Sequence, residues 1–215
     1  KKLSKRANET SLLEYRNLGF LPEAMINFLV LLGWHPEGNE EIFSLEEMVA
    51  IFNLTRVQKG GAVFNQEKLD WLSGQYISSF TALEIYSRLK EFKKDKKLDD
   101  RPEFVQKIIE VLKERMKTWE DFWHLSDFFF ELPDYEIGLL RWKEQSLPDI
   151  QIILNKVLEQ WKEIGESDFV FENLQKKIEI VISGATRGEV LWPLRVSLSG
   201  KSVSEQKNQD NIENN

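Results

Sequence analysis

The chain has 215 residues and a mass of 25.3 kDa; 41% of its residues are hydrophobic and 30% are charged. This composition is typical of a globular protein with one large core or two modest ones, and it excludes disordered and fibrous proteins. The net charge of -7 argues against a uniformly basic surface that coats nucleic acid, although a local basic face is still compatible with it.

The sequence also limits the compartment and the metal chemistry. It contains no cysteine, which excludes disulfides and thiolate metal sites and suits a reducing compartment. The longest apolar run, AMINFLVLLGW at 24–34, is shorter than the roughly 20 residues that cross a bilayer, and no signal peptide is visible. We therefore expect a cytoplasmic protein without a membrane partner. Neither His35 nor His124 has another ligand at suitable spacing, so no metal site is predicted.

The first ten residues, KKLSKRANET, are strongly basic, with four basic residues among the first six. A loop of this kind can close over a triphosphate and place ammonium groups against the charge that develops on the leaving pyrophosphate. Lys5 would make the main contact, because an ammonium group is a compact charge that can follow a moving phosphate, and Lys2, Ser4 and Arg6 would support it. A five-residue basic loop is weak evidence by itself, and a solvated charged end is the alternative interpretation.

Helical signals dominate the remainder of the chain. Pro22 fits the first turn of a helix that Gly33 ends. Two capping-box spacings precede apolar-periodic runs, at Ser44 with Glu47 and at Thr81 with Glu84. The clearest pattern opens at 100–103 and continues as one stripe of Val105, Ile108, Ile109, Leu112, Met116, Trp119 and Trp123.

Two more helices are predicted towards the end of the chain, before one ambiguous segment. The first begins near Ser146 and Pro148, with an apolar side of Ile150, Leu154, Val157, Leu158 and Trp161. The second carries Leu174, Ile178, Val181 and Ile182. The segment VLWPLRVSL at 190–198 is ambiguous, because its alternation is strand-like whereas Pro193 argues against a central strand. The prediction is an all-α protein.

Two segments look like boundaries. KKDKKLDDRP at 93–102 is a charged break between helices, and the sequence after Gly200 has too few apolar residues to pack, so we expect it to be disordered. Between Arg88 and Arg101 there are seven basic and four acidic residues, a local positive excess in an acidic protein. Lysines of this segment are candidates for a phosphate track, although a solvated charged face is an equally good interpretation.

Three stretches near the start carry a family resemblance. They are EYRNLGFLPEAMINFLVLLGWHP at 14–36, EEIFSLEEMVAIFNLTRV at 40–57 and FNQEKLDWLSGQYI at 64–77. In this order after KLSKR, they resemble the region that follows the signature loop of bacterial-type glutamyl-tRNA synthetases, which are class I aminoacyl-tRNA synthetases. LKERMKTWEDFWHLSDFFF at 112–130 and GEVLWPLRVSLSG at 188–200 resemble later landmarks, so the likeness covers roughly residues 1 to 200.

The resemblance implies a domain order and a reaction. It implies a KLSKR loop and stem-contact helical region at 1–95, a helical-cage anticodon-binding domain at 96–200 and a disordered tail at 201–215. The parent enzyme attaches glutamate to tRNA-Glu with ATP through glutamyl-adenylate, with Mg2+ expected beside ATP. Lys5 would then be the catalytic residue, and Lys2, Ser4, Lys5 and Arg6 the ATP-binding set.

The same resemblance suggests where tRNA is held. Lys90, Lys93 and Lys94 are candidates for phosphate contacts, and Arg115, in KERMKTW, matches a recurrent family position and is the candidate closest to the anticodon. Arg195, in WPLR, is a weaker candidate. Either arginine could instead serve structure, Arg115 by pairing within its helix and Arg195 by capping a helix end.

Departures from the family pattern set the expected limits. The upstream nucleotide-binding part with its HxGH-type motif is missing, so the partners ATP and glutamate would need that part, and the chain alone is expected to be an inactive monomer. Ser73 and Asp70 stand where the family often has asparagine. Two alternatives stay open: a non-catalytic RNA-binding or scaffold protein that reuses the helical cage, and a glutaminyl-tRNA synthetase. The second binds its anticodon with strand-rich domains, which the sequence does not suggest.

Overall fold

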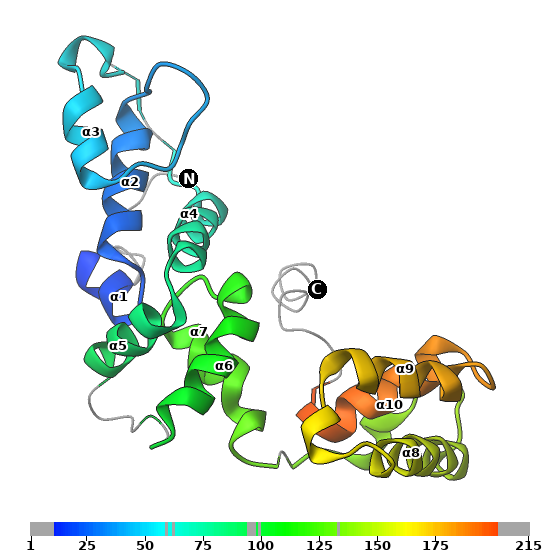
Figure 1. Cartoon of the computed structure of the whole chain (residues 1–215). Coiled ribbons are helices and arrows are strands. Elements are labelled where there is room, and N and C mark those ends of the chain that lie inside the picture. The colour runs from blue at the N-terminus through cyan, green and yellow to red at the C-terminus, as the bar shows by residue number, and fades with distance from the viewer. Residues whose placement is uncertain are drawn as a thin grey trace. The chain divides into compact units, whose positions relative to one another are not determined.

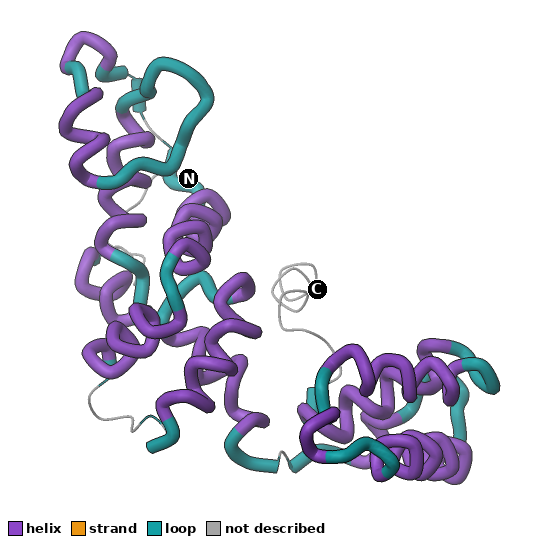
Figure 2. Tube along the Cα trace, in the orientation of Figure 1, coloured by secondary structure: helices purple, strands orange, loops and turns teal. Residues whose placement is uncertain are grey.

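The structure is a computed structural model that describes residues 11–58, 60–61, 63–93, 98, 100–132 and 134–201. The described residues form helices and short 3-10 turns without a strand (Figures 1 and 2), which confirms the all-α prediction. Their contacts divide the chain into two compact units, Lys1–Ser126 and Asp127–Asn215. None of the described helices is long and apolar enough to cross a membrane.

The first unit is built from seven α-helices among the described residues. They are α1 (Leu12–Asn17), α2 (Pro22–Gly33), α3 (Leu45–Ile51), α4 (Gln66–Ser79), α5 (Ala82–Phe92), α6 (Pro102–Leu112) and α7 (Glu120–Ser126). Helix α2 packs on α4, and α5 packs on α6. Two 3-10 turns, η1 (Leu54–Arg56) and η2 (Lys113–Arg115), complete the unit. The one pairing of strand type in the described residues is a single bridge between Trp34 and Val57.

The predicted helix starts are confirmed where the sequence supplies a cap. Pro22 occupies the first turn of α2. Both predicted capping boxes are formed, with the side chains and backbones of Ser44 and Glu47 paired reciprocally at α3 and those of Thr81 and Glu84 at α5. Each box satisfies main-chain N–H groups that have no partner inside the helix, and this fixes where the helix begins.

The apolar core of the first unit follows the predicted stripes. A central cluster between α2 and α4 contains Phe20, Met25, Phe28, Leu69 and Leu72, all at most 9% exposed. The stripe of α6 is buried as well. Helix α4 and helix α6 both contact η2, which connects the α2–α4 pair to the α5–α6 pair.

The long stripe predicted after residue 102 is wrong as a single helix. Helix α6 ends at Leu112, η2 follows, and Met116 is extended with φ -82° and ψ 135°. A new helix, α7, then begins, because the Asp121 carboxylate accepts the main-chain N–H groups of Lys117 and Thr118 at 2.7 and 2.8 Å. The apolar spacing continues across the break because Met116 and Trp119 are buried as well, at 1% and 6% exposed.

The second unit is a small helical layer. Its elements are η3 (Asp127–Phe129), η4 (Ile137–Leu140), α8 (Leu147–Lys162), η5 (Glu166–Asp168), α9 (Phe171–Ile182) and α10 (Arg187–Ser199). Helix α8 packs against both α9 and α10. Ser146 caps α8 as predicted, but Leu158 is 48% exposed and does not belong to the buried side.

The ambiguous segment 190–198 is helical. It lies within α10, which a reciprocal capping box of Thr186 and Glu189 opens and Gly200, with φ 66°, closes. Pro193 sits inside this helix and is buried. The strand-like alternation therefore misleads here, because the start signal at Thr186 lies outside the window in which the alternation occurs.

The functional boundary predicted at 95/96 differs from the compact units. The structure separates its units at Ser126, and the helices on either side of 93–102, α5 and α6, pack on each other within the first unit. The boundary at 95/96 stays a prediction about function. The predicted tail at 201–215 lies outside the described residues except for Lys201.

Candidate nucleic-acid interface

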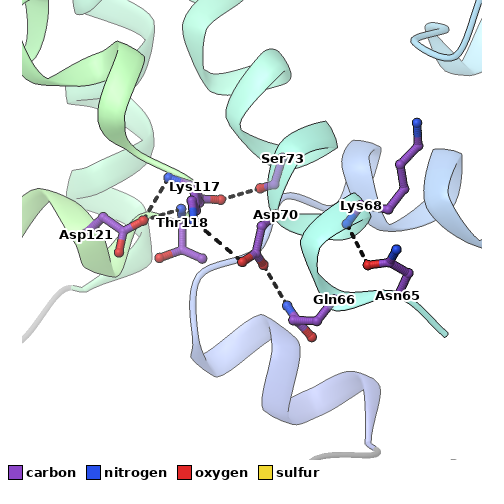
Figure 3. A network of polar contacts seen from close by, with 8 residues as sticks. All are labelled: Asn65, Gln66, Lys68, Asp70, Ser73, Lys117, Thr118 and Asp121. Atoms are coloured by element: carbon purple, nitrogen blue, oxygen red, sulfur yellow. Dashed lines mark hydrogen bonds and ion pairs between the residues drawn. The ribbon is translucent and has the colours of Figure 1, made fainter. Parts of the chain in front are cut away.

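A polar junction ties helix α4 to the loop that precedes α7 (Figure 3). The hydroxyl of Ser73, which is 0% exposed, donates to the main-chain carbonyl of Lys117, and the Lys117 ammonium lies 3.7 Å from the Asp70 carboxylate. Asp70 and Ser73, the two positions expected to depart from the family pattern, therefore both contact Lys117. Asp70 and Ser73 stand three residues apart on one face of α4, and that face contacts both the main-chain carbonyl and the ammonium group of Lys117.

The junction extends along α4 towards α1. Gln66 donates its side-chain amide to Asp70 Oδ1 at 2.7 Å (Figure 3). The amide oxygen of Gln66 lies 3.4 Å from the hydroxyl of Tyr15 in α1. Polar contacts thus run from α1 through Gln66 and Asp70 to Lys117. The loop 116–118 is therefore linked to α1 through residues of α4.

A second link joins the same two regions through the backbone. The Trp119 N–H donates to the carbonyl of Gly19 at 2.9 Å. Gly19 has φ +86°, and a Cβ added there would lie 2.9 Å from the main-chain nitrogen of Trp119. A glycine is therefore required at this position both for its backbone conformation and for the close approach of the backbone segments around Gly19 and Trp119.

Arg115 lies at the end of η2, next to this junction, and is half-buried. The alternative in which Arg115 pairs within its helix is not seen, and the Glu110 carboxylate lies 2.9 Å from the Lys113 ammonium instead. Within the described part of the chain the Arg115 guanidinium makes no hydrogen bond or ion pair. A planar cation that is held on a rigid turn without an internal partner has its donors available for a phosphate or a base.

The predicted lysine track is only partly described. Lys90 is exposed on α5, with its ammonium 5.5 Å from the Tyr86 ring centroid. Lys93 instead pairs with Glu120 and lies over the Trp123 ring, so its charge is partly used inside the protein. Lys94 lies outside the described residues, as do Lys96 and Lys97. Among the described members of the track, Lys90 is the better phosphate candidate.

Arg195 belongs to the second unit. It is exposed on α10, and its main-chain carbonyl accepts the Ser199 hydroxyl at 2.8 Å. Its side chain does not cap a helix end in the described structure, because Gly200 closes α10 through its backbone N–H to Val196. Arg195 and Arg115 lie in different units.

The predicted ATP-loop residues Lys2, Ser4, Lys5 and Arg6 all lie outside the described residues. As donors they suit phosphate oxygens, since they offer three cations and a hydroxyl. Among the residues that the structure describes, no cluster of three acidic, histidine or cysteine side chains could hold a metal ion.

Sequence reasoning missed two surface features of the first unit. Lys117 was not a candidate, although it stands two residues from Arg115 in the same KERMKTW motif. Trp71 is 42% exposed on α4 with the Lys68 ammonium 4.4 Å from its ring centroid. An exposed aromatic on a polar helix is the available signal, because most tryptophans of this chain are at least half-buried.

A buried hydrogen-bonded group of Tyr76, Asn27 and the Phe43 backbone connects α4 to α2. The Tyr76 hydroxyl lies 2.6 Å from the Phe43 carbonyl oxygen and 2.8 Å from Asn27 Oδ1, which also accepts the Phe43 N–H at 2.9 Å. Burial raises the pKa of Tyr76 above its ordinary value of 10.0, and the neighbouring Glu23 and Glu47 raise it further, whereas the hydrogen bond to Phe43 opposes both. The group locks α2, α4 and the segment before α3 together.

Two family models match successive parts of the chain. The model for the catalytic domain of class I tRNA synthetases (E and Q) matches residues 1–71, and the model for an anticodon-binding domain matches residues 78–208. Helix α4, Gln66–Ser79, contains the end of the first match and the start of the second.

Individual relatives match nearly the whole chain. It is 37% identical over 207 residues to the glutamate–tRNA ligase of Clostridium acetobutylicum, covering 94% of this chain and 42% of the relative. For the Clostridium kluyveri ligase the identity is 36%, covering 93% of this chain and 41% of the relative. A crystal structure of a glutamate tRNA ligase from Elizabethkingia meningosepticum, in complex with its amino acid, superposes with a TM-score of 0.73 at 32% identity, covering 88% of this chain and 38% of that one. The chain thus spans about two fifths of the length of these relatives.

Proposed function

Because this chain belongs to the glutamate–tRNA ligase family of class I tRNA synthetases and aligns with the C-terminal part of those enzymes, we propose that it is the tRNA-docking part of such a ligase. In this proposal it binds tRNA-Glu through its helices. It also contributes the basic loop that contacts ATP in the catalytic site.

The observation that carries the proposal is the single helix shared by both family matches. The catalytic-domain match ends at residue 71 and the anticodon-binding match begins at residue 78, and both positions lie inside α4. The segment that matches the catalytic domain and the segment that matches the anticodon-binding domain are therefore joined through one helix. This arrangement suits an enzyme that must bring the end of a tRNA to an activated amino acid while it holds the RNA elsewhere.

The reaction that we propose for the whole enzyme has two steps. Glutamate attacks ATP to form glutamyl-adenylate with loss of pyrophosphate, and the glutamyl group then moves to the end of tRNA-Glu. Lys5, supported by Lys2, Ser4 and Arg6, would neutralise the charge that grows on the leaving pyrophosphate. Magnesium is expected to accompany ATP and to shield phosphate charge when bound.

The docking surface that we propose lies on the first unit, with a separate contribution from the second. Arg115, with no internal partner among the described residues, contacts the RNA near the anticodon, Lys90 contacts phosphate, and the junction of Asp70, Ser73 and Lys117 holds the supporting loop. Lys93, Lys94 and Arg195 are further contacts. Phosphate contacts position the RNA and base contacts specify it, so the two kinds of residue should separate in experiment.

Binding of tRNA at several salt concentrations tests this function. The chain is titrated with tRNA-Glu and with a copy in which the anticodon is altered. We expect salt-dependent binding of both and tighter binding of the first, because counterion release serves any RNA whereas base contacts serve one. Equal binding of both RNAs would contradict anticodon recognition, and absence of binding would contradict docking by this part alone.

The same proposal includes the oligomeric state and the catalytic activity of the isolated chain. It is a monomer, and it does not catalyse ATP–pyrophosphate exchange, since the chain spans about two fifths of the curated relatives. Measurable ATP–pyrophosphate exchange by the 215-residue chain would contradict the expected lack of activity. The competing function is a scaffold protein that reuses the helices. Equal aminoacylation activity of a complete ligase with Lys5→Ala and with the unchanged chain would favour that alternative.

A further inference from the structure

The turn that precedes α8 contains a strained backbone conformation. Lys143 has φ 53°, and it is the one non-glycine residue with a positive φ among the residues that the structure describes. The Gln145 N–H donates to the Trp142 carbonyl at 3.1 Å, which closes a turn with Lys143 and Glu144 as its central residues. In turns whose first central residue alone has a positive φ, glycine is the usual residue at that position.

The residue before Lys143 is held firmly against α10. The ring centroids of Trp142 and Trp192 lie 5.2 Å apart, and a Cβ added to Gly188 would lie 2.4 Å from the Trp142 indole. Trp192 Nε1 in turn donates to the main-chain carbonyl of Leu139 at 2.9 Å. These contacts fix Trp142 in the second unit, and they can therefore maintain a strained residue next to it.

The side chain of Lys143 does not explain the strain. It is exposed, and its ammonium forms no ion pair among the described residues; the ammonium lies 5.6 Å from the Trp142 ring centroid. The carboxylate of Glu189, which lies in the same region, accepts the Thr186 N–H at 2.8 Å instead. Glycine would adopt the same φ without strain, so a structural role alone does not account for a lysine at this position.

The charge around the turn indicates a ligand. Arg141 is exposed as well, and within the described part of the chain its side chain makes no hydrogen bond or ion pair. Glu144 is also exposed, so the turn offers two separate cations rather than a continuous basic surface. The turn belongs to the segment 78–208 that matches an anticodon-binding domain. A compact ammonium group on a fixed turn suits a phosphate oxygen, because little backbone freedom is lost on binding.

We propose that Lys143 is a phosphate-binding residue of the second unit, presented by the strained turn, and that Arg141 makes a second phosphate contact. The ligand is the sugar–phosphate backbone of RNA, and this inference rests on the proposed function for the identity of that RNA. Because phosphate contacts carry no sequence information, these two residues should contribute equally to binding of tRNA-Glu and of the anticodon-altered copy.

The test measures stability and RNA binding on one variant, Lys143→Gly in the 215-residue chain. Since glycine relieves the strain of a positive φ, we expect a Tm no lower than that of the unchanged chain and higher by up to about 4 °C. The same variant should bind both tRNAs about three- to tenfold more weakly at about 0.1 M salt, and its slope of log affinity against log salt should fall by about 1.

Matched variants separate charge from backbone conformation. Lys143→Asn removes the charge but tolerates a positive φ, so it should lose affinity as Lys143→Gly does. Lys143→Arg keeps the charge and should bind within about twofold of the unchanged chain. Arg141→Ala should lower the salt slope by about 1 as well. Lys156→Ala removes an exposed lysine of α8 in the same unit and should leave the affinity within about twofold.

A higher or equal Tm together with weaker binding of both tRNAs would support the proposal, because a residue that serves only structure cannot give this pair of results. Unchanged tRNA binding by Lys143→Gly would overturn it and leave the proposed function intact. A clearly lower Tm would overturn it by showing that the lysine stabilises the turn, and an equal loss of affinity in Lys156→Ala would reduce it to a general effect of charge. Absence of RNA binding by the unchanged chain would overturn both proposals.

Discussion

The side-chain amide of Gln145 donates to the main-chain carbonyl of Glu189 at 3.2 Å. That carbonyl is the one that residue 193 would normally bind in an α-helix, and residue 193 is a proline without an N–H group. Gln145, from the segment before α8, thus replaces the helical hydrogen bond that Pro193 removes. The helix can therefore contain a buried proline because a distant glutamine occupies the carbonyl that the proline leaves without a donor.

Replacing Gln145 should destabilise the second unit. Gln145→Ala leaves the Glu189 carbonyl without its partner, and we expect a loss of about 1–2 kcal/mol in the free energy of unfolding. In a Pro193→Ala background the helix regains its own donor, so the same substitution should cost clearly less. Urea unfolding of the unchanged chain, the two single variants and the double variant measures the coupling between Gln145 and Pro193. If Gln145→Ala costs the same free energy in the unchanged chain and in the Pro193→Ala background, Gln145 does not replace the missing hydrogen bond.

Gly19 should tolerate no side chain. Gly19→Ala combines a positive φ of 86° with a Cβ 2.9 Å from the Trp119 nitrogen, so we expect a loss of about 1–3 kcal/mol for the backbone alone and more for the clash. Gly38→Ala is the matched control, because Gly38 has φ +98° but nothing within 4 Å of an added Cβ. Thermal unfolding compares the two, and equal losses would mean that the contact with Trp119 is unimportant.

Tyr76 should make stability fall at high pH. Its folded-state pKa is raised by burial above the ordinary 10.0, so the folded protein keeps this proton longer than the unfolded chain does. Its contribution is therefore complete below about pH 10 and is lost as the pH rises towards the folded pKa. Tyr76→Phe should remove this part of the alkaline loss and cost about 1–2 kcal/mol at neutral pH through its hydrogen bonds. Tyr86→Phe is the control, and identical alkaline profiles for Tyr76→Phe and the unchanged chain would contradict the prediction.

Two capping glutamates should contribute to acid sensitivity. The Thr81 main-chain N–H holds the pKa of Glu84 below its ordinary value, and the Thr186 main-chain N–H does the same for Glu189. A lowered folded pKa gives stability that is present above the unfolded pKa of about 4.5 and is lost as the pH falls through the folded value. Glu84→Gln and Glu189→Gln should flatten the acid limb of stability against pH. Glu91→Gln, outside any cap, should not change it.

The tRNA contacts should separate into two kinds. Lys90→Ala should lower the slope of log affinity against log salt by about 1 for every tRNA, because it removes one phosphate contact. Arg115→Ala should reduce the preference for tRNA-Glu over the anticodon-altered copy, since it removes planar donors. Lys156→Ala, an exposed lysine on α8, is the control for charge alone. An Arg115→Ala variant that weakens both RNAs equally would place Arg115 on phosphate instead.

The sequence allowed the local parts of the fold to be predicted, because they depend on neighbouring residues. The boxes at Ser44 and Thr81 are set by side chains three positions apart. The break after Leu112 could not be predicted in the same way, since the apolar spacing continues through it and only the Asp121 cap reveals the new helix. In α10 the alternation around Pro193 obscured a readable capping box at Thr186.

The site was predicted less completely, for a related reason. Arg115 was identified from its motif, but the motif did not indicate that Glu110 pairs with Lys113 and that the Arg115 guanidinium has no partner among the described residues. The contacts of Lys117 with Asp70 and Ser73 join residues that are far apart in the sequence. Contacts of that kind depend on how α4 meets the loop 116–118, which no local pattern specifies.

Helix α4 also bears on how related enzymes can exchange parts. Residues 71 and 78, where the two family matches end and begin, both lie inside it, and its buried side chains lie on both sides of residue 71. Exchange between relatives at residue 71 would combine part of one helix with part of another and mismatch Leu69 with Leu72, Tyr76 and Ile77. Successful chimeras, natural or designed, should therefore inherit α4 whole, together with the loop 116–118 that contacts it.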